Sequence, residues 1–250
     1  EEMYSTPWFK ESLRAITNER SSALMMGSIV YAGPDLYNAA MLFPEGGAPP
    51  QIYYKNHLVL MGETVPLPDW FPFLDRLVPL GQNFSRGSSA PVLRMDDDGI
   101  RIAPLICFED TFGRVARRFA DQKPNLLVNI TNDGWFNRSF QSRQHLANSV
   151  FRAVENRISL LRVSNNGVTA WVDHKGVIRP GNMLGELGKD SLHDAGTLTV
   201  TIPITEPATT LYQRFGDWPG WLGIVGMVIA AGWPWKKQPG KTKKKNTNGH

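Results

Sequence analysis

The sequence has a single cysteine, Cys107, in 250 residues. One cysteine excludes an internal disulfide and any cysteine-rich zinc site, because both need several thiols in one chain. It leaves the cellular compartment open, since a lone thiol is compatible with an oxidising or a reducing environment. We expect neither a metal ion nor a cofactor.

Net charge is also scarce, at +4, and it is unevenly placed. Six lysines lie between Lys236 and Lys245, so the last residues account for more than the whole excess. The remaining chain is close to neutral and has no basic stripe with interleaved aromatic residues, which argues against nucleic acid as a partner. Hydrophobic residues make up 42% and charged residues 20%, which is typical of a globular protein.

The beginning of the chain, Glu1-Glu2-Met3, lacks the charged and apolar regions of a signal peptide. Because no initiator methionine comes first, we expect the sequence to be a fragment of a longer protein.

Strand and helix patterns alternate along the chain, which predicts an α/β layered domain whose apolar strands are covered on both faces. Helical spacing covers residues 8–20, 112–122 and 142–157. Strand patterns cover residues 22–31, 38–43, 51–55, 99–107, 125–130, 159–164, 168–172, 177–178 and 196–204. Residues 62–90 are rich in proline, glycine and serine, and a long irregular segment of this kind is more often functional than structural.

The C-terminal part changes character, because no charged residue occurs from Trp218 to Trp235. Its strictly apolar centre is shorter than the roughly 20 residues of a spanning helix, although the flanking tryptophans and prolines nearly supply that length. Terminal tryptophans suit a membrane interface, and the lysines suit a cytoplasmic end. We predict one transmembrane helix over 218–235 and a basic cytoplasmic tail over 236–250; a buried helix with a solvated tail is the alternative.

Cys107 stands where the apolar strand pattern ends, and the charged residues Glu109 and Asp110 follow it. A buried, inert thiol is the alternative interpretation. However, a thiol at a strand end, before a helix whose first N–H groups can stabilise negative charge, suits a nucleophile. Such a nucleophile needs a base to deprotonate it and a cation to stabilise the developing negative charge. Lys55 is the candidate for the cation, and Glu63 follows it eight residues later. Taken alone, Lys55 is more readily interpreted as a surface lysine, and Glu63 as a loop carboxylate.

Several segments together carry a resemblance: YYKNHLVLMGETVPL at 53–67, ICFE around Cys107 and NITNDGWF at 129–136. They resemble the carbon–nitrogen hydrolase (nitrilase) superfamily and, within it, the apolipoprotein N-acyltransferases of bacterial membranes. FSRG, QHL, SNNGVTA and RFGDWPGW follow in the order and spacing of that branch. The resemblance implies a nitrilase-like αββα sandwich over residues 1–207 and a Glu–Lys–Cys triad.

The implied reaction moves an acyl chain from a phospholipid to Cys107 as a thioester, and then to the N-terminal cysteine amine of a diacylglyceryl-modified apolipoprotein. Lys55 and the backbone N–H of Phe108 would stabilise the oxyanion. Glu63 would support the lysine and cysteine, and Glu109 matches another acidic position of the family.

The general base falls on Glu1, with Glu2 as the alternative, because the family places it in a Trp-Pro-Glu-like motif upstream of the lysine. Phe108 departs from the tyrosine common in that branch, so no hydroxyl is present there. Trp135 is a candidate for lining the acyl site. Arg86 and His145 match family positions without a defined role.

Three alternatives remain open. A soluble amidohydrolase would use the same triad with water as acceptor, but it would need no apolar C-terminal segment. A Cys107–His145 dyad would need His145 within hydrogen-bond reach of the sulfur, and the sequence suggests no partner to orient it. A membrane-tethered module with a decayed site is the non-enzymatic option. The preferred interpretation places the catalytic domain on the periplasmic side of the bacterial inner membrane, with phospholipid and apolipoprotein as partners.

Overall fold

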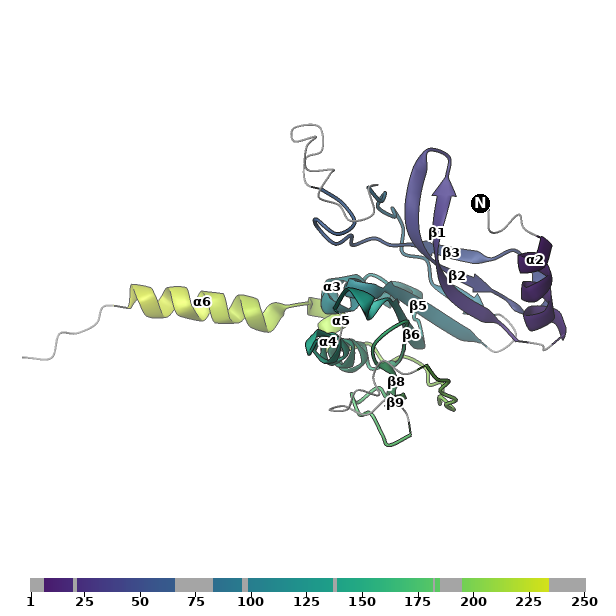
Figure 1. Ribbon diagram of the computed structural model, residues 1–250. Coiled ribbons are helices and arrows are strands. Elements are labelled where there is room, and N and C mark those ends of the chain that lie inside the picture. The colour runs from purple at the N-terminus through teal and green to yellow at the C-terminus, as the bar shows by residue number, and fades with distance from the viewer. Residues whose placement is uncertain are drawn as a thin grey trace, which may run out of the picture. The chain divides into compact units, whose positions relative to one another are not determined.

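The computed structural model describes residues 7–19, 22–65, 83–95, 99–136, 139–181, 183–184 and 195–233. These residues form two compact units, 1–216 and 217–250, which are treated separately below. The first unit contains two β-sheets (Figure 1).

The first sheet has three antiparallel strands in the order β1-β2-β3. Their bounds are β1 (Leu24–Ala32), β2 (Asp35–Phe43) and β3 (Gln51–Tyr54). Strand β2 is buried on both faces, because alternate residues point to opposite sides. Ala40 and Leu42 face the main core, whereas Met41 and Phe43 pack with Leu13 of helix α2 (Pro7–Arg14).

The second sheet has six strands in the order β4-β5-β6-β7-β8-β9, and β5, β6 and β7 are parallel. Their bounds are β4 (Leu93–Met95), β5 (Ile100–Ile106), β6 (Leu126–Thr131), β7 (Ser159–Ser164), β8 (Thr169–Val172) and β9 (Met183–Leu184). Three helices complete this unit: α3 (Gly113–Arg117), α4 (Gln141–Asn156) and α5 (Leu211–Phe215).

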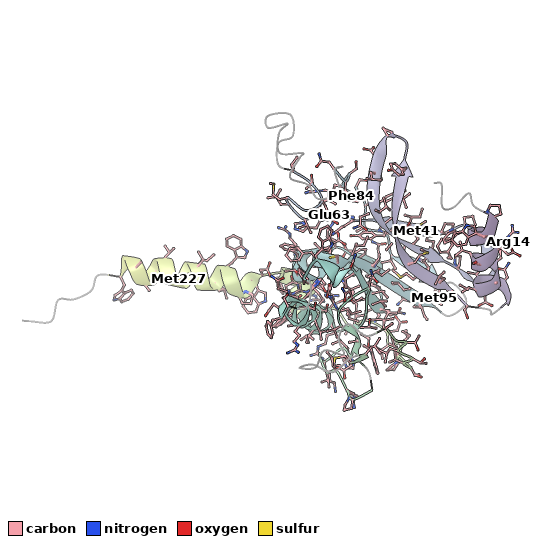
Figure 2. All side chains as sticks on the ribbon, in the orientation of Figure 1. Arg14, Met41, Glu63, Phe84, Met95 and Met227 are labelled. Atoms are coloured by element: carbon pink, nitrogen blue, oxygen red, sulfur yellow. The ribbon has the colours of Figure 1, made fainter. Side chains whose placement is uncertain are left out.

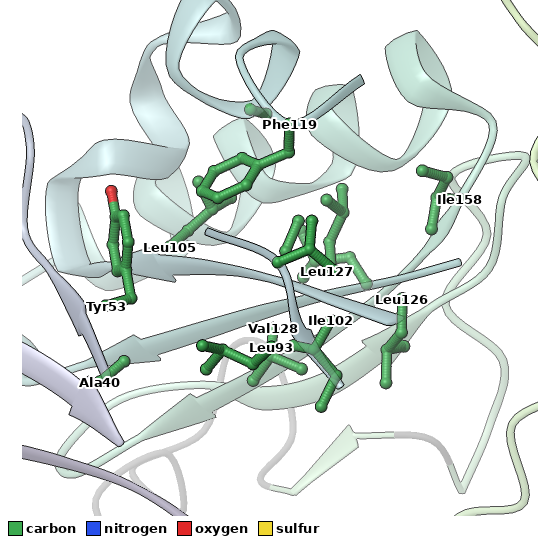
Figure 3. Packing of buried hydrophobic residues seen from close by; sticks show 14 of the residues in the cluster. Ala40, Tyr53, Leu93, Ile102, Leu105, Phe119, Leu126, Leu127, Val128 and Ile158 are labelled. Carbon is green, nitrogen blue, oxygen red and sulfur yellow. The ribbon is translucent and has the colours of Figure 1, made fainter. Parts of the chain in front are cut away.

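The two sheets pack face to face through β2 on β5 and β1 on β6, while α3 and α4 cover the outer face of the second sheet. In Figure 3, Leu105, Leu127 and Phe119 lie on the helix side of that sheet, and Leu93, Val128 and Ala40 lie on its other side. The order of layers is therefore helix, sheet, sheet, helix, which confirms the predicted α/β sandwich.

The predicted elements agree with the structure in most places. The helix predicted over 112–122 is interrupted, since α3 ends at Arg117 and a short 3-10 helix covers Ala120–Gln122. The strands predicted over 177–178 and 196–204 are wrong. Their backbone groups form no ladder with any of the described strands, so the apolar alternation of these segments does not correspond to a strand. The short strands β4 and β9 were not predicted.

In the second unit, helix α6 (Trp218–Gly232) contains no charged residue. Pro219 stands in its first turn, where the missing N–H of proline costs nothing. None of the helices in the described residues is long and apolar enough to cross a membrane. The predicted helix is thus present in part, whereas a membrane span over 218–235 is not found.

Candidate active site

Cys107 lies at the end of β5 and begins the 3-10 helix Cys107–Thr111. Its φ is +50°, a left-handed conformation that is uncommon for a residue with a side chain. The carboxyl ends of the parallel strands β5, β6 and β7 meet at this edge, which is where open α/β sheets usually bind ligands. Strain at such an edge is typical of a residue held in place for function.

Lys55 follows β3 directly, and its side chain is fully buried. Its Nζ donates to both carboxylate oxygens of Glu63, at 2.8 and 2.7 Å. Glu63 also accepts from Asn38 Nδ2 and from the backbone N–H of Val59, both at 2.9 Å. Glu63 lies beside Phe84 (Figure 2), whose N–H donates to the Glu63 carbonyl. The lysine charge is therefore paired inside the protein, and the structure brings Lys55 and Glu63 together.

Glu109 is completely buried and links the lysine segment to the cysteine turn. Its Oε1 accepts from the backbone N–H groups of Asn56 and His57, at 2.8 and 2.9 Å. Its Oε2 accepts from the N–H of Ile106 at 2.8 Å. Because Asn56 follows Lys55 and Ile106 precedes Cys107, one carboxylate fixes both segments together.

The Tyr53 hydroxyl donates to the same carboxylate at 2.9 and 3.0 Å. Burial raises the pKa of Glu109, although the N–H groups of Ile106 and His57 and the charge of Lys55 oppose that effect. Burial, together with the neighbouring Glu109, also raises the pKa of Tyr53. The sequence analysis missed Tyr53; its position two residues before Lys55, on the same side of a strand, was the available signal.

A buried cluster of charged side chains lies under the cysteine turn. Arg162 of β7 is fully buried and pairs with Asp110 at 2.8 Å and with Asp133 at 2.9 Å. His145 of α4 places Nδ1 3.0 Å from Asp133 Oδ1 and Nε2 2.9 Å from Asp110 Oδ1. Two carboxylates therefore face two cations, and their formal charges cancel. Asp110, Asp133 and Arg162 were not predicted as site residues, because they are brought together only by the packing of α4 on β7 and on the 3-10 helices Cys107–Thr111 and Asp133–Phe136.

His145 does not form the dyad considered from the sequence. Within the described residues it makes no hydrogen bond to the Cys107 sulfur; instead Nε2 contacts the Cys107 carbonyl oxygen at 3.3 Å. The expectation that His145 lacks an orienting partner is wrong, since Asp133 and Asp110 both hold the ring. Burial lowers the pKa of His145, but the hydrogen bonds to Asp110 and Asp133 outweigh it and raise the pKa to about 9.

The remaining candidate residues from the sequence are Phe108, Trp135, Arg86, Glu1 and Glu2. The Phe108 ring packs edge-on against Phe112, with centroids 5.4 Å apart. Trp135 lies in the 3-10 helix Asp133–Phe136 and is 58% exposed. Arg86 is exposed, next to Gly87, whose N–H donates to the Lys55 carbonyl at 2.9 Å. Glu1 and Glu2 lie outside the described residues, so the predicted base stays a prediction.

The comparisons with known proteins agree with this fold. Residues 6–206 match the carbon–nitrogen hydrolase family, so the chain belongs to that family. The fold is also that of an amidase from Nesterenkonia sp. AN1, with a TM-score of 0.55 and 19% identity over 88% of this chain and 76% of that one. A carbon–nitrogen hydrolase from Helicobacter pylori G27 gives a TM-score of 0.53 at 14% identity, over 71% of this chain and 62% of that one.

Among curated proteins, the chain is similar to the apolipoprotein N-acyltransferase of Geobacter metallireducens, with 34% identity over 90% of this chain and 42% of that protein. It is 38% identical to apolipoprotein N-acyltransferase 1 of Treponema denticola, over 77% of this chain and 35% of the relative. The chain thus spans about two fifths of the length of these relatives.

Proposed function

We propose that this chain is the catalytic part of an apolipoprotein N-acyltransferase. In this proposal, the Cys107 thiolate attacks an ester carbonyl of a phospholipid and expels lysophospholipid, whose alkoxide takes up the proton lost by the thiol. The amine of a diacylglyceryl-modified N-terminal cysteine then attacks the thioester, forms the amide and releases the thiol. The acyl chain thus passes from an ester to a thioester to an amide without a cofactor.

One observation carries the proposal: Glu109 holds the Lys55–His57 segment against the Ile106–Cys107 turn. A nucleophile and a buried cation on two different sheets are thereby tied to one carboxylate. Stabilising the developing oxyanion is usually the largest single contribution to acyl transfer, and a preorganised cation can provide it. Lys55, oriented by Glu63, has that role in the proposal, together with the backbone N–H of Phe108.

Glu1 is proposed as the general base that removes the thiol proton, with Glu2 as the alternative. Trp135 is proposed to contact the acyl chain, because a large exposed aromatic side chain near the strand ends suits an apolar substrate. The domain arrangement proposed is a catalytic domain over 1–207, a membrane segment over 218–235 and a basic cytoplasmic tail over 236–250. The uncharged helix α6 supports an attachment to the inner membrane, and the lysine-rich tail supports a catalytic domain on the periplasmic side.

The acceptor distinguishes this proposal from an amidohydrolase with the same triad. The full-length protein is incubated with phospholipid and a synthetic diacylglyceryl-cysteine peptide, and the products are measured by mass spectrometry. We expect an N-acylated peptide together with an equal amount of lysophospholipid. Free fatty acid with no acylated peptide would instead identify water as the acceptor and reject the acyltransferase proposal.

A further inference from the structure

The Cys107 carbonyl oxygen accepts hydrogen bonds from two side chains beneath the turn. Asn129 Nδ2 of β6 donates to it at 3.0 Å, and His145 Nε2 of α4 lies 3.3 Å from it. A carbonyl oxygen can only accept, so the His145 contact requires a proton on Nε2, and Asp110 Oδ1 lies 2.9 Å from the same nitrogen. Nδ1 lies 3.0 Å from Asp133 Oδ1, which can only accept, and 2.9 Å from Arg162 Nη2, which can only donate.

A carboxylate oxygen lies within 3.0 Å of each ring nitrogen, which favours an imidazolium that donates from both, while the Arg162 guanidinium opposes that charge. The groups facing it are the carboxylates of Asp110 and Asp133, the Arg162 guanidinium and the rings of Phe108 and Phe136. The two carboxylates balance the two cations, which explains how a charged imidazole is stable at 3% exposure. The direction of the His145 pKa, raised to about 9, agrees with this protonation state.

The carbonyl of Cys107 and the N–H of Phe108 belong to the same peptide unit. No cis peptide bond occurs in the described chain, so this N–H points away from the carbonyl oxygen across a planar group. Fixing the oxygen towards Asn129 and His145 fixes the N–H in the opposite direction. Hydrogen bonds to the carbonyl also polarise the peptide group, which strengthens its N–H as a donor.

We propose that His145 and Asn129 are positioning residues for the oxyanion site: they orient and polarise the Cys107–Phe108 peptide whose N–H stabilises the tetrahedral intermediate. This inference rests on the proposed function only in its use of that N–H, and it holds for any acyl donor. It assigns the buried Asp110–Asp133–Arg162 cluster the task of keeping His145 charged and in place.

Two reactions of Cys107 separate this role from a general effect on the thiol. Acylation by p-nitrophenyl butyrate passes through a tetrahedral oxyanion, whereas alkylation by iodoacetamide does not. In His145→Gln we expect the maximal acylation rate to fall about 10- to 100-fold, less than for loss of a direct oxyanion donor. The half-saturating ester concentration and the alkylation rate should stay within about threefold of wild type, since neither depends on an oxyanion.

Asn129→Leu tests the same carbonyl without removing a buried charge, so it is the second variant if His145→Gln folds poorly. Ser142→Ala is the matched control. Ser142 is buried on α4, three residues before His145, and its hydroxyl has no hydrogen-bond partner among the described residues. We expect it to leave acylation close to the wild-type rate.

Equal losses of acylation and alkylation in Asn129→Leu would overturn the inference, because the thiol and not the oxyanion site would then be affected. Unchanged acylation would overturn it as well. Failure of the proposed function is distinguishable, because Cys107 of the wild-type protein would then be acylated by the p-nitrophenyl ester but not by phospholipid.

Discussion

At the scale of single residues, the account depends on how charges are held inside the protein. Lys55 is fully buried, and Glu63, with a side chain only 14% exposed, is its ion-pair partner. Removing one partner of a buried pair leaves an uncompensated charge, which is far more costly than removing both. Stability and catalysis should therefore respond differently to changes at this pair.

Glu63→Gln should lower the free energy of unfolding by about 3–5 kcal/mol, the range for a broken buried pair. The double variant Lys55→Met with Glu63→Leu should recover much of that stability and still form no acyl-enzyme, because no cation remains for the oxyanion. Chemical denaturation and intact mass measure the two effects. Glu206→Gln is the matched control, since Glu206 pairs with Arg101 with its side chain 83% exposed and should cost below about 1 kcal/mol. A double variant that still acylates would contradict the role of Lys55.

Glu109 provides a second test at this scale. Both oxygens of the Glu109 carboxylate accept from N–H or O–H donors. Glu109→Gln replaces one of these oxygens by an amide NH2, so two hydrogen-bond donors would then face each other. We expect acyl-enzyme formation to fall at least about 100-fold, as when a positioned catalytic group is displaced. Tyr53→Phe, which removes only one of the donors, should cost much less. Single-turnover acylation measures both, and equal activities would contradict the linking role of Glu109.

At the scale of elements, the strand ends decide where the site forms. Helix α4 was predictable because its apolar and polar positions repeat with helical period, and β5 and β6 because their residues are almost wholly apolar. Lys55, Glu63, Cys107 and Glu109 were predictable as a set because the motifs occur in order. Arg162 was not, because a buried arginine in an apolar strand makes sense only once Asp110 and Asp133 face it. Residues 196–204 were assigned to a strand wrongly, because alternation alone does not provide a partner.

The contact between α4 and the strand ends gives a pH dependence of stability. The folded pKa of His145, about 9, lies above the 6.5 of a free imidazole, so folding takes up a proton between these values. The contribution of His145 is then fully present below about pH 6.5 and is lost as the pH rises through about 9. Unfolding free energies from pH 6 to 10 should converge between wild type and His145→Gln as the pH rises. Parallel curves would contradict a charged His145.

The loop after β3 packs too closely for any side chain at Gly87. A Cβ there would overlap the Tyr54 carbonyl oxygen, so the backbone that carries Lys55 must move. Gly87→Ala should reduce acylation more than alkylation of Cys107, because it displaces the cation and leaves the thiol in place. Gly220→Ala is a suitable control for the substitution itself, since no atom lies within 4 Å of its Cβ and its backbone is helical. Full activity in Gly87→Ala would show that this contact does not position Lys55.

At the scale of the whole molecule, the proposed phospholipid substrate requires that the proposed catalytic domain reach a bilayer. Helix α6 is uncharged and carries tryptophans at its start, Trp218 and Trp221, which suits a membrane interface. With its 15 residues it has a length of about 22 Å, less than the apolar thickness of a bilayer, so the proposed span requires residues beyond Gly232.

Topology can be tested by labelling introduced cysteines in a Cys107→Ala background. Gln238→Cys, in the lysine-rich tail, should react with a membrane-impermeant maleimide only after spheroplasts are lysed. Lys175→Cys, at an exposed position of the catalytic domain, should react in intact spheroplasts. Labelling at residue 238 from outside would reject a membrane span and a cytoplasmic tail.

The central claim is that Cys107 carries the acyl chain. Wild-type protein incubated with phospholipid should gain the mass of one acyl group, lose it on treatment with neutral hydroxylamine, and yield the modified peptide that contains Cys107. Cys107→Ala should gain no mass. No adduct on wild-type protein, or an adduct that persists in Cys107→Ala, would contradict the account.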